Sequence, residues 1–181
     1  NTPSCGLLSE SLVKWRREED TNLLMGGSVF RDTHKPRIQN IRKTVANFFG
    51  ASENEVALIP NFSFGMNTLL EGLPKGQKVL LLERDYPSIT WSVERHGFEI
   101  CYASIDENLE QNIERAVAEH RPDILALSIV QYLSGIKIDF DFLLKLKAYN
   151  PNLLIIADGT QYFGTEPFNF AESPFDVVGC S

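Results

Sequence analysis

A run of apolar residues that ends in an acid constrains the fold of this chain more than any other feature. Residues 153–157 are all apolar, without the alternation of a half-exposed strand, and Asp158 follows them directly. Such a run is typical of a strand covered on both faces, as in a parallel sheet between two layers of helices. Because ligands of such sheets bind beyond the carboxyl ends of the strands, we expect Asp158 at a ligand-binding edge.

Strand-like and helix-like segments alternate through most of the chain. The expected strands cover residues 55–60, 78–83, 99–104, 123–130, 152–157 and 176–180. The expected helices between them cover residues 62–73, 88–96, 108–120 and 140–149. This alternation predicts an α/β fold, in which βαβ units build a doubly wound, mostly parallel sheet flanked by helices.

The first 50 residues have a helical pattern instead. Residues 1–6 are turn-forming, and residues 7–24 have the spacing of an amphipathic helix, which the glycines of residues 25–29 are expected to break. A second helix is expected from Pro36 to Gly50, since proline is tolerated in a first helical turn and glycine ends a helix well.

Composition narrows the possible functions. The 181 residues, 43% of them hydrophobic, are enough for one core. A net charge of −7 without a basic block disfavours nucleic acid as a partner. No apolar run reaches the roughly 18 to 20 residues of a membrane helix, and no signal-peptide pattern opens the chain. Three widely spaced cysteines indicate neither a disulfide framework nor a metal site, which favours a reducing, cytoplasmic compartment.

The first candidate for chemistry is the segment from Asn61 to Asn67, where a strand is expected to turn into a helix. Free backbone N–H groups at a helix start favour a phosphate, and here Phe64 and Gly65 would donate them while Ser63 adds a hydroxyl. The alternative is that Asn61 or Ser63 only caps the helix.

Three further polar or aromatic positions follow expected strands. Tyr86 can lie flat on an aromatic ligand or can be a packing residue, and Gln131 can bond a ligand or only a neighbouring loop. Asp158, with Gln161 close behind, can hold a protonated ring nitrogen, bind Mg²⁺ or cap the following turn.

These positions are expected to form one site, because parallel strands bring their carboxyl ends to the same edge of the sheet. A phosphate cradle, an aromatic plate, an amide and a carboxylate match the needs of pyridoxal 5'-phosphate, whose protonated ring is an electron sink.

Several segments carry a family resemblance in the right order: residues 1–8 (NTPSCGLL), 45–67, 83–91 (ERDYPSITW), 128–139, 157–161 (ADGTQ) and 175–181. On these, the chain resembles the class V aminotransferase family of fold-type I pyridoxal-phosphate enzymes. That family holds cysteine desulfurases, selenocysteine lyases, kynureninases and isopenicillin-N epimerase-like proteins.

The resemblance implies a role for each candidate residue. Ser63 and Phe64 would touch the phosphate, Tyr86 would stack on the ring, and Asp158 would pair with the pyridine nitrogen. The remaining members of the implied cofactor-binding set are Gln131 and Gln161, near the phenolic oxygen, and Ser181.

Two positions depart from the family pattern. Residues 61–64 read Asn-Phe-Ser-Phe where many relatives carry a Gly-Ala-Thr-like stretch, although serine keeps the hydroxyl. Tyr86, followed by Pro87 and Ser88, stands where many desulfurases have histidine, which favours the kynureninase and epimerase-like branches.

The resemblance also implies parts outside this chain, which begins at Asn1 and ends at Ser181 inside an expected strand. The lysine that forms a Schiff base with the cofactor would follow Ser181 by three positions, and the smaller C-terminal domain would be absent. We therefore expect residues 1–35 to contribute a segment and helix to the active-site edge, and residues 36–181 to form an incomplete cofactor-binding large domain.

The predicted function is that of a pyridoxal-phosphate-dependent enzyme acting on an amino acid by transaminase or lyase chemistry, expected as a homodimer. The 181-residue chain itself is expected to be inactive. Two alternatives remain: a catalytically silent α/β domain used for binding or dimerisation, and a domain that binds another phosphorylated ligand at residues 61–67.

Overall fold

A computed structural model describes residues 6–181, which form two compact units. The helical unit ends at Ala57, and the sheet unit spans Leu58–Ser181. Most of the predicted turn at residues 1–6, and most of the family-like opening at residues 1–8, lie outside the described residues.

The helical unit consists of two long helices and one short turn of helix: α1 (Glu10–Asp32), α2 (His34–Phe49) and η1 (Glu53–Glu55). An ion pair of 2.7 Å between Arg37 and Glu19 links α1 to α2. The expected break within residues 25–29 is present at Gly27, where the non-helical φ of +51° and ψ of −127° divide α1 into two helical segments, the second of which ends at Asp32. Glycine adopts this conformation readily because it has no Cβ, so the sequence correctly identifies where the first helical segment ends.

Gly50 ends α2 in the left-handed conformation, with φ of +66°, as the sequence predicts. We expect Gly50→Ala to lower the free energy of unfolding by about 1 kcal/mol, because a Cβ is disfavoured at this φ. Gly72 is the matched control, since it ends α3 (Phe62–Gly72) at a negative φ with open space around an added Cβ. Urea unfolding of both variants tests this, and an equal effect at the two sites would contradict it.

The sheet unit contains five parallel strands in the order β2-β1-β3-β4-β5. They are β1 (Lys78–Leu82), β2 (Glu99–Ala103), β3 (Ile124–Ser128), β4 (Leu154–Asp158) and β5 (Val177–Gly179). The predicted parallel α/β fold is therefore confirmed, and the apolar run that ends in Asp158 is a nearly central strand with neighbours on both sides.

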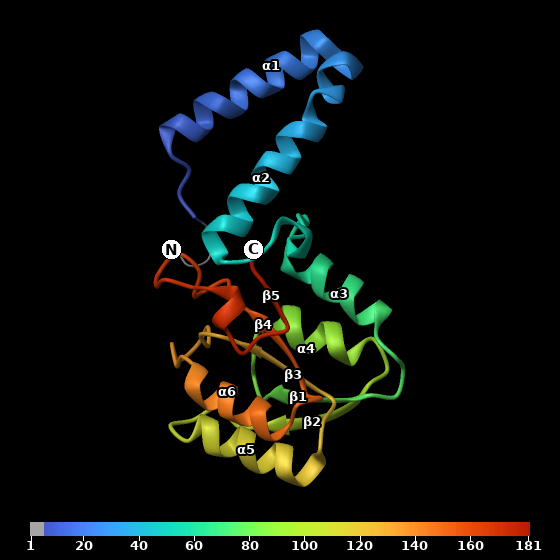
Figure 1. The fold of residues 1–181 in the computed structure, drawn as a ribbon, viewed down its shortest axis with the longest axis vertical. Helices are drawn as coiled ribbons and strands as arrows, with labels where there is room; N and C mark the ends of the chain where they lie inside the picture. Colours follow the sequence, from blue (N-terminus) through green and yellow to red (C-terminus); the bar gives the residue numbers. More distant parts are fainter. Residues whose placement is uncertain (1–5) are drawn as a thin grey trace. The chain divides into compact units, whose positions relative to one another are not determined.

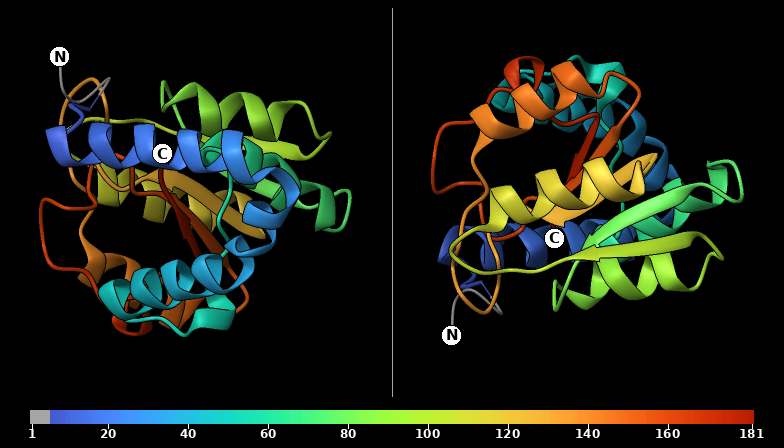
Figure 2. Two further views of the ribbon diagram at one scale, coloured as in Figure 1. Left: turned by 90° about the horizontal axis from the view of Figure 1, so that it is seen from above. Right: turned by 90° about the horizontal axis from the view of Figure 1, so that it is seen from below.

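Helices cover both faces of this sheet (Figures 1 and 2). One face packs against α3 and α4 (Pro87–Glu94), and the other packs against α5 (Leu109–His120) and α6 (Phe140–Tyr149). Successive strand residues alternate between the two cores, so that Ile124 points to the α3 and α4 side and Leu125 to the α5 and α6 side. A short 3₁₀ helix, η2 (Phe170–Glu172), precedes β5.

The expected strand over residues 55–60 is wrong. Glu55 belongs to η1, and the following residues pair with no strand in the described part of the chain. Leu58 and Ile59 remain 44% and 38% exposed. Strand propensity depends on a neighbouring strand to pack and bond against, and these residues have none among residues 6–181.

The order in which strands are added to the sheet changes direction between β1 and β3, although the strands themselves are parallel. The chain moves from β1 outward to β2 and then returns to place β3 on the other side of β1. Such a switch point leaves a crevice at the carboxyl ends of the two strands, which is where open α/β sheets bind ligands. No helix among residues 6–181 is long and apolar enough to cross a membrane.

Candidate functional site

The carboxyl edge of the sheet carries most of the predicted residues. Tyr86 follows β1, Gln131 follows β3, Asp158 is the last residue of β4, and Ser181 follows β5. Asp158 pairs in register with Ser128 on one side and Gly179 on the other. The convergence expected from the strand order is therefore present.

The start of α3 is tied to this edge. The Phe62 N–H donates to Ser181 Oγ at 3.0 Å, and the Ser181 N–H donates to Thr160 Oγ1 at 3.1 Å. A chain of two hydrogen bonds thus connects the first turn of α3, through Ser181, to the loop that begins at Asp158.

Asn61 caps α3 with its side chain, as the alternative interpretation proposed. Its Oδ1 accepts from the Phe64 N–H at 2.9 Å, and its backbone carbonyl accepts from the Gly65 N–H at 3.2 Å. The expectation of open N–H groups at Phe64 and Gly65 is therefore wrong. The open donor lies one residue earlier, since the Ser63 N–H has no hydrogen-bond partner within residues 6–181.

Hydroxyl groups surround that open donor. Ser63 Oγ hydrogen-bonds Ser88 Oγ at 2.9 Å, which joins α3 to α4. A surface depression of about 460 Å³ lies over this contact. It is lined by Ser63, Asn67, Tyr86, Pro87, Ser88, Trp91, Ser92 and Arg95. Two of the predicted residues, Ser63 and Tyr86, therefore share one hollow with a basic side chain.

Tyr86 stands at the N-cap position of α4 and is 45% exposed. Its ring meets the ring of Tyr132 edge to face, with centroids 5.2 Å apart. The backbone N–H of Tyr86 donates to Asp85 Oδ1 at 2.7 Å, which fixes the start of the ring-bearing segment. An exposed, anchored ring suits stacking on a planar ligand better than it suits a purely internal packing role.

Gln131 is almost fully buried, with one unsatisfied atom. Its Nε2 donates to the Ser128 carbonyl at 3.0 Å, while its Oε1 is buried without a hydrogen-bond partner among residues 6–181. A buried polar atom without a partner is uncommon and calls for a ligand or water. Gln161 lies in the loop after β4, three residues beyond Asp158, and is half-buried.

Asp158 is 6% exposed and accepts a hydrogen bond of 2.9 Å from the Thr160 N–H. Burial raises the pKa of its carboxyl above the ordinary 3.8, hydrogen bonds from Thr160 lower it, and the negative charge of Asp85 raises it again. No basic group of residues 6–181 forms an ion pair with it. The cap expected as an alternative is present, yet it leaves this buried acid without a counter-ion.

The raised pKa predicts a pH-dependent stability. Because the Asp158 carboxyl has a higher pKa in the folded than in the unfolded state, the folded state binds more protons between the two values. The contribution of Asp158 to the free energy of unfolding is fully present below the unfolded-state pKa near 3.8. It is lost as the pH rises through the folded-state pKa. We therefore expect Asp158→Asn to gain stability relative to the wild type as pH rises. Urea unfolding at several pH values measures this, and a pH-independent difference would contradict it.

Asp85 is the residue that the sequence interpretation missed. It lies three residues beyond the end of β1, is 3% exposed, and forms hydrogen bonds with Ser128 at the end of β3. An acid after an apolar strand is the same signal that identified Asp158, and it was available in the sequence at this position too.

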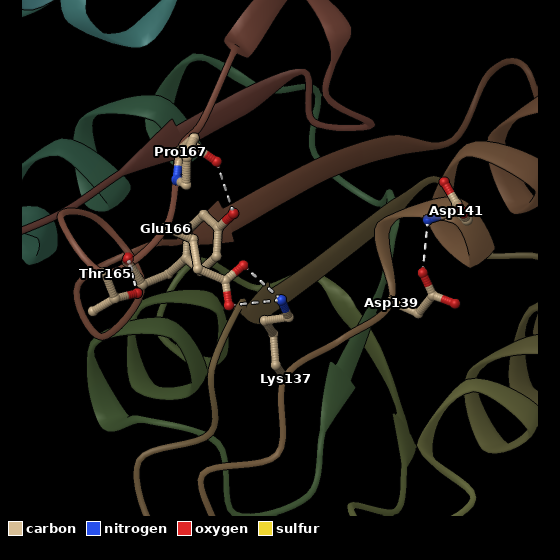
Figure 3. Close-up of polar contacts among 7 residues, drawn as sticks. Lys137, Asp139, Asp141, Thr165, Glu166 and Pro167 are labelled. Carbon is tan, nitrogen blue, oxygen red and sulfur yellow. Dashed lines mark hydrogen bonds and ion pairs between the residues drawn. The ribbon is translucent and has the colours of Figure 1, made fainter.

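Lys137, which lies between β3 and α6, forms an ion pair with Glu166. Its Nζ contacts both carboxylate oxygens of Glu166, at 2.7 and 3.0 Å, and lies 5.8 Å from the centre of the Tyr162 ring (Figure 3). The Tyr162 hydroxyl in turn donates to the Pro167 carbonyl at 3.4 Å. The hydrogen bonds that Lys137 donates to the Glu166 carboxylate raise the pKa of this lysine, and they link two loops of the sheet unit.

Comparison with known proteins gives this edge a context. The model of the family described as aminotransferase class V matches residues 9–181. A curated relative, the cysteine desulfurase IscS of Mannheimia succiniciproducens, is 24% identical over 149 residues, which cover 77% of this chain and 37% of the relative. The chain thus spans well under half the length of this relative.

Solved structures share the fold. The cysteine desulfurase CsdA of Escherichia coli superposes with a TM-score of 0.78 at 14% identity, over 98% of this chain and 48% of CsdA. An apo cysteine desulfurase from Thermococcus onnurineus NA1 superposes with a TM-score of 0.70 at 19% identity, over 82% of this chain and 39% of the desulfurase. A histidinol-phosphate aminotransferase from Sinorhizobium meliloti, solved with pyridoxal 5'-phosphate, superposes with a TM-score of 0.57 at 15% identity. The superposition covers 77% of this chain and 39% of the aminotransferase.

Proposed function

Since the chain belongs to the class V aminotransferase family, whose members use pyridoxal 5'-phosphate, we propose that its sheet edge is the cofactor site of an enzyme acting on an amino acid. The reaction class is transamination or a lyase reaction. When bound, the cofactor supplies an electron sink for the carbanion formed at the substrate Cα.

The observation that carries this proposal is the buried acid without a counter-ion. Asp158 is a buried carboxylate at the edge of the sheet, and its Oδ1 accepts a hydrogen bond from the Thr160 N–H. A protonated ring nitrogen supplies both the positive charge and the N–H donor that such an acid lacks. In this role Asp158 holds the proton on the ring nitrogen, which preserves the electron sink.

The phosphate end of the site is assigned to the start of α3. The Ser63 N–H and hydroxyl are the first donors, and the Phe64 N–H joins them by exchanging its bond to Asn61 Oδ1 for one to the phosphate. Ser181 donates from the far side through its hydroxyl and holds the start of α3 in place.

The ring is assigned to three side chains. Tyr86 stacks on one face, and Gln131 and Gln161 lie beside the phenolic oxygen. The buried, unpaired Oε1 of Gln131 supports a ligand contact at that position. The residues present therefore fit the cofactor at its phosphate, its ring face and its ring nitrogen.

The finer parts of the proposal rest on the family pattern. We place the lysine that binds the cofactor covalently three residues beyond Ser181, residues 1–35 at the active-site edge, and the complete enzyme in the cytoplasm as a homodimer. Tyr86 with Pro87 and Ser88 supports a kynureninase-like or epimerase-like branch.

A titration separates this function from the alternatives. We expect the protein to bind pyridoxal 5'-phosphate more tightly than ATP or inorganic phosphate, as measured for each ligand by isothermal titration calorimetry. In the 181-residue chain, borohydride should trap no stoichiometric covalent adduct. Equal binding of ATP would favour a general phosphate site, and no binding of any of these would favour a silent domain.

A further inference from the structure

Asp85 is a buried carboxylate at the switch point of the sheet. It lies three residues beyond the end of β1, and its side chain reaches across to the end of β3, the strand on the other side of the crevice. Only 3% of its surface is exposed, and no ion pair to it occurs among residues 6–181. A buried acid of this kind persists only where hydrogen-bond donors surround it.

Those donors come from two places on the chain. Asp85 Oδ1 accepts from the Tyr86 N–H at 2.7 Å and from Ser128 Oγ at 2.6 Å, and Oδ2 accepts from the Ser128 N–H at 2.8 Å. The Gln131 side chain lies near enough to lower the pKa of this carboxyl, and its Nε2 donates to the carbonyl of Ser128. Burial raises the pKa of Asp85, and the donors from Ser128, Tyr86 and Gln131 lower it.

Each donor leads to a residue of the proposed cofactor site. Tyr86 carries the stacking ring, and Gln131 carries the amide with the unpaired Oε1. Ser128 is paired in register with Asp158 on the adjoining strand. One carboxylate therefore connects the ring face, the phenolic side and the ring-nitrogen side of the site.

The carboxylate also determines how the Gln131 amide is oriented. The Nε2 group of Gln131 donates to the carbonyl of Ser128, the residue that Asp85 holds by two hydrogen bonds, and Oε1 is left without a partner among the described residues. A neutral amide at position 85 would place an NH₂ group among hydrogen-bond donors and would weaken the hydrogen bonds that hold Ser128 in place.

We propose that Asp85 is a positioning residue of the cofactor site, which holds the Tyr86 ring and the Gln131 amide in the geometry that receives pyridoxal 5'-phosphate. This inference rests on the proposed function, because it concerns the same site. Asp85 acts through Tyr86, Ser128 and Gln131 and does not touch the cofactor itself.

The test compares Asp85→Asn with the wild type in the complete protein that contains this chain. We expect the dissociation constant for pyridoxal 5'-phosphate to rise about tenfold or more, as for the loss of a hydrogen bond to a charged group. We also expect the visible circular dichroism per bound cofactor to fall, because a loosened site holds the ring less asymmetrically.

A purely structural role would lower stability without changing how the bound cofactor is held. Ile124→Ala is the matched control, since Ile124 is fully buried at the opposite end of β3. It should lower the melting temperature while leaving the dichroism per bound cofactor unchanged. If Asp85→Asn does not fold, Ser128→Ala removes only the 2.6 Å hydroxyl bond and should change both readouts in the same direction by a smaller factor.

The outcomes separate the two proposals. A wild-type protein that does not bind pyridoxal 5'-phosphate would overturn the proposed function and this inference with it. Normal binding by the wild type, with an unchanged dissociation constant and dichroism in Asp85→Asn or Ser128→Ala, would overturn the inference alone.

Discussion

Replacing Asp158 by alanine in the complete protein is expected to lower kcat/KM on the order of 10³-fold while the fold is retained. The loss follows from the role of Asp158 as the buried partner of the ring nitrogen, because a preorganised charge in a water-poor site contributes more than it would in water. The fold should survive, since the variant removes a buried charge that has no counter-ion among residues 6–181. Steady-state kinetics and far-ultraviolet circular dichroism measure the two effects.

A carboxylate at the opposite edge of the sheet provides the control. Asp123 accepts a hydrogen bond of 2.8 Å from the Lys78 N–H, where β1 begins, and is exposed. Asp123→Ala should leave kcat/KM within a few-fold of the wild-type value. Comparable activity losses in both variants would show that removal of any strand-end acid is harmful and would contradict a special role for Asp158.

Replacing Leu125 by alanine is expected to cause the largest loss of stability. Leu125 is fully buried in β3, the middle strand of the sheet, and packs in the core on the α5 and α6 side. Deleting a buried leucine side chain costs about 3 to 5 kcal/mol, from lost burial and the cavity left behind. A domain of this size should then melt roughly 2–4 °C lower for each kcal/mol. Thermal unfolding followed by circular dichroism measures the shift.

Leu144 on α6 is the matched site for the same substitution. It is 43% exposed, so Leu144→Ala removes little buried surface and should change the free energy of unfolding by less than about 1 kcal/mol. Equal destabilisation at Leu125 and Leu144 would mean that β3 does not form the core that positions Ser128 and Gln131.

The strand and helix order was predictable because most of its signals are local. The apolar run before Asp158 and the glycine stop at Gly50 each depend on a few neighbouring residues. The segment 55–60 has the same local strand signal but no partner strand among the described residues, and pairing is a property that its own sequence does not contain. The interruption of α1 at Gly27 is a local signal as well, because glycine readily adopts the non-helical conformation that separates the two helical segments.

The site was predictable in its placement and less so in its hydrogen bonds. Strand ends located Tyr86, Gln131 and Asp158, since parallel strands bring their carboxyl ends together. The partners of Asp85 escaped prediction because Ser128 is 43 residues away in the sequence, and only the strand order brings it close. The open donor at Ser63 likewise depends on which N–H groups the Asn61 cap already uses.

The central claim is that Asp158 pairs with the ring nitrogen of pyridoxal 5'-phosphate. The most direct measurement compares the binding of this cofactor with that of an analogue in which the ring nitrogen is replaced by CH, in the wild type and in Asp158→Ala. We predict that the wild type binds the cofactor at least about tenfold more tightly than the analogue, and that Asp158→Ala loses this preference. Equal preference in both proteins would contradict the account.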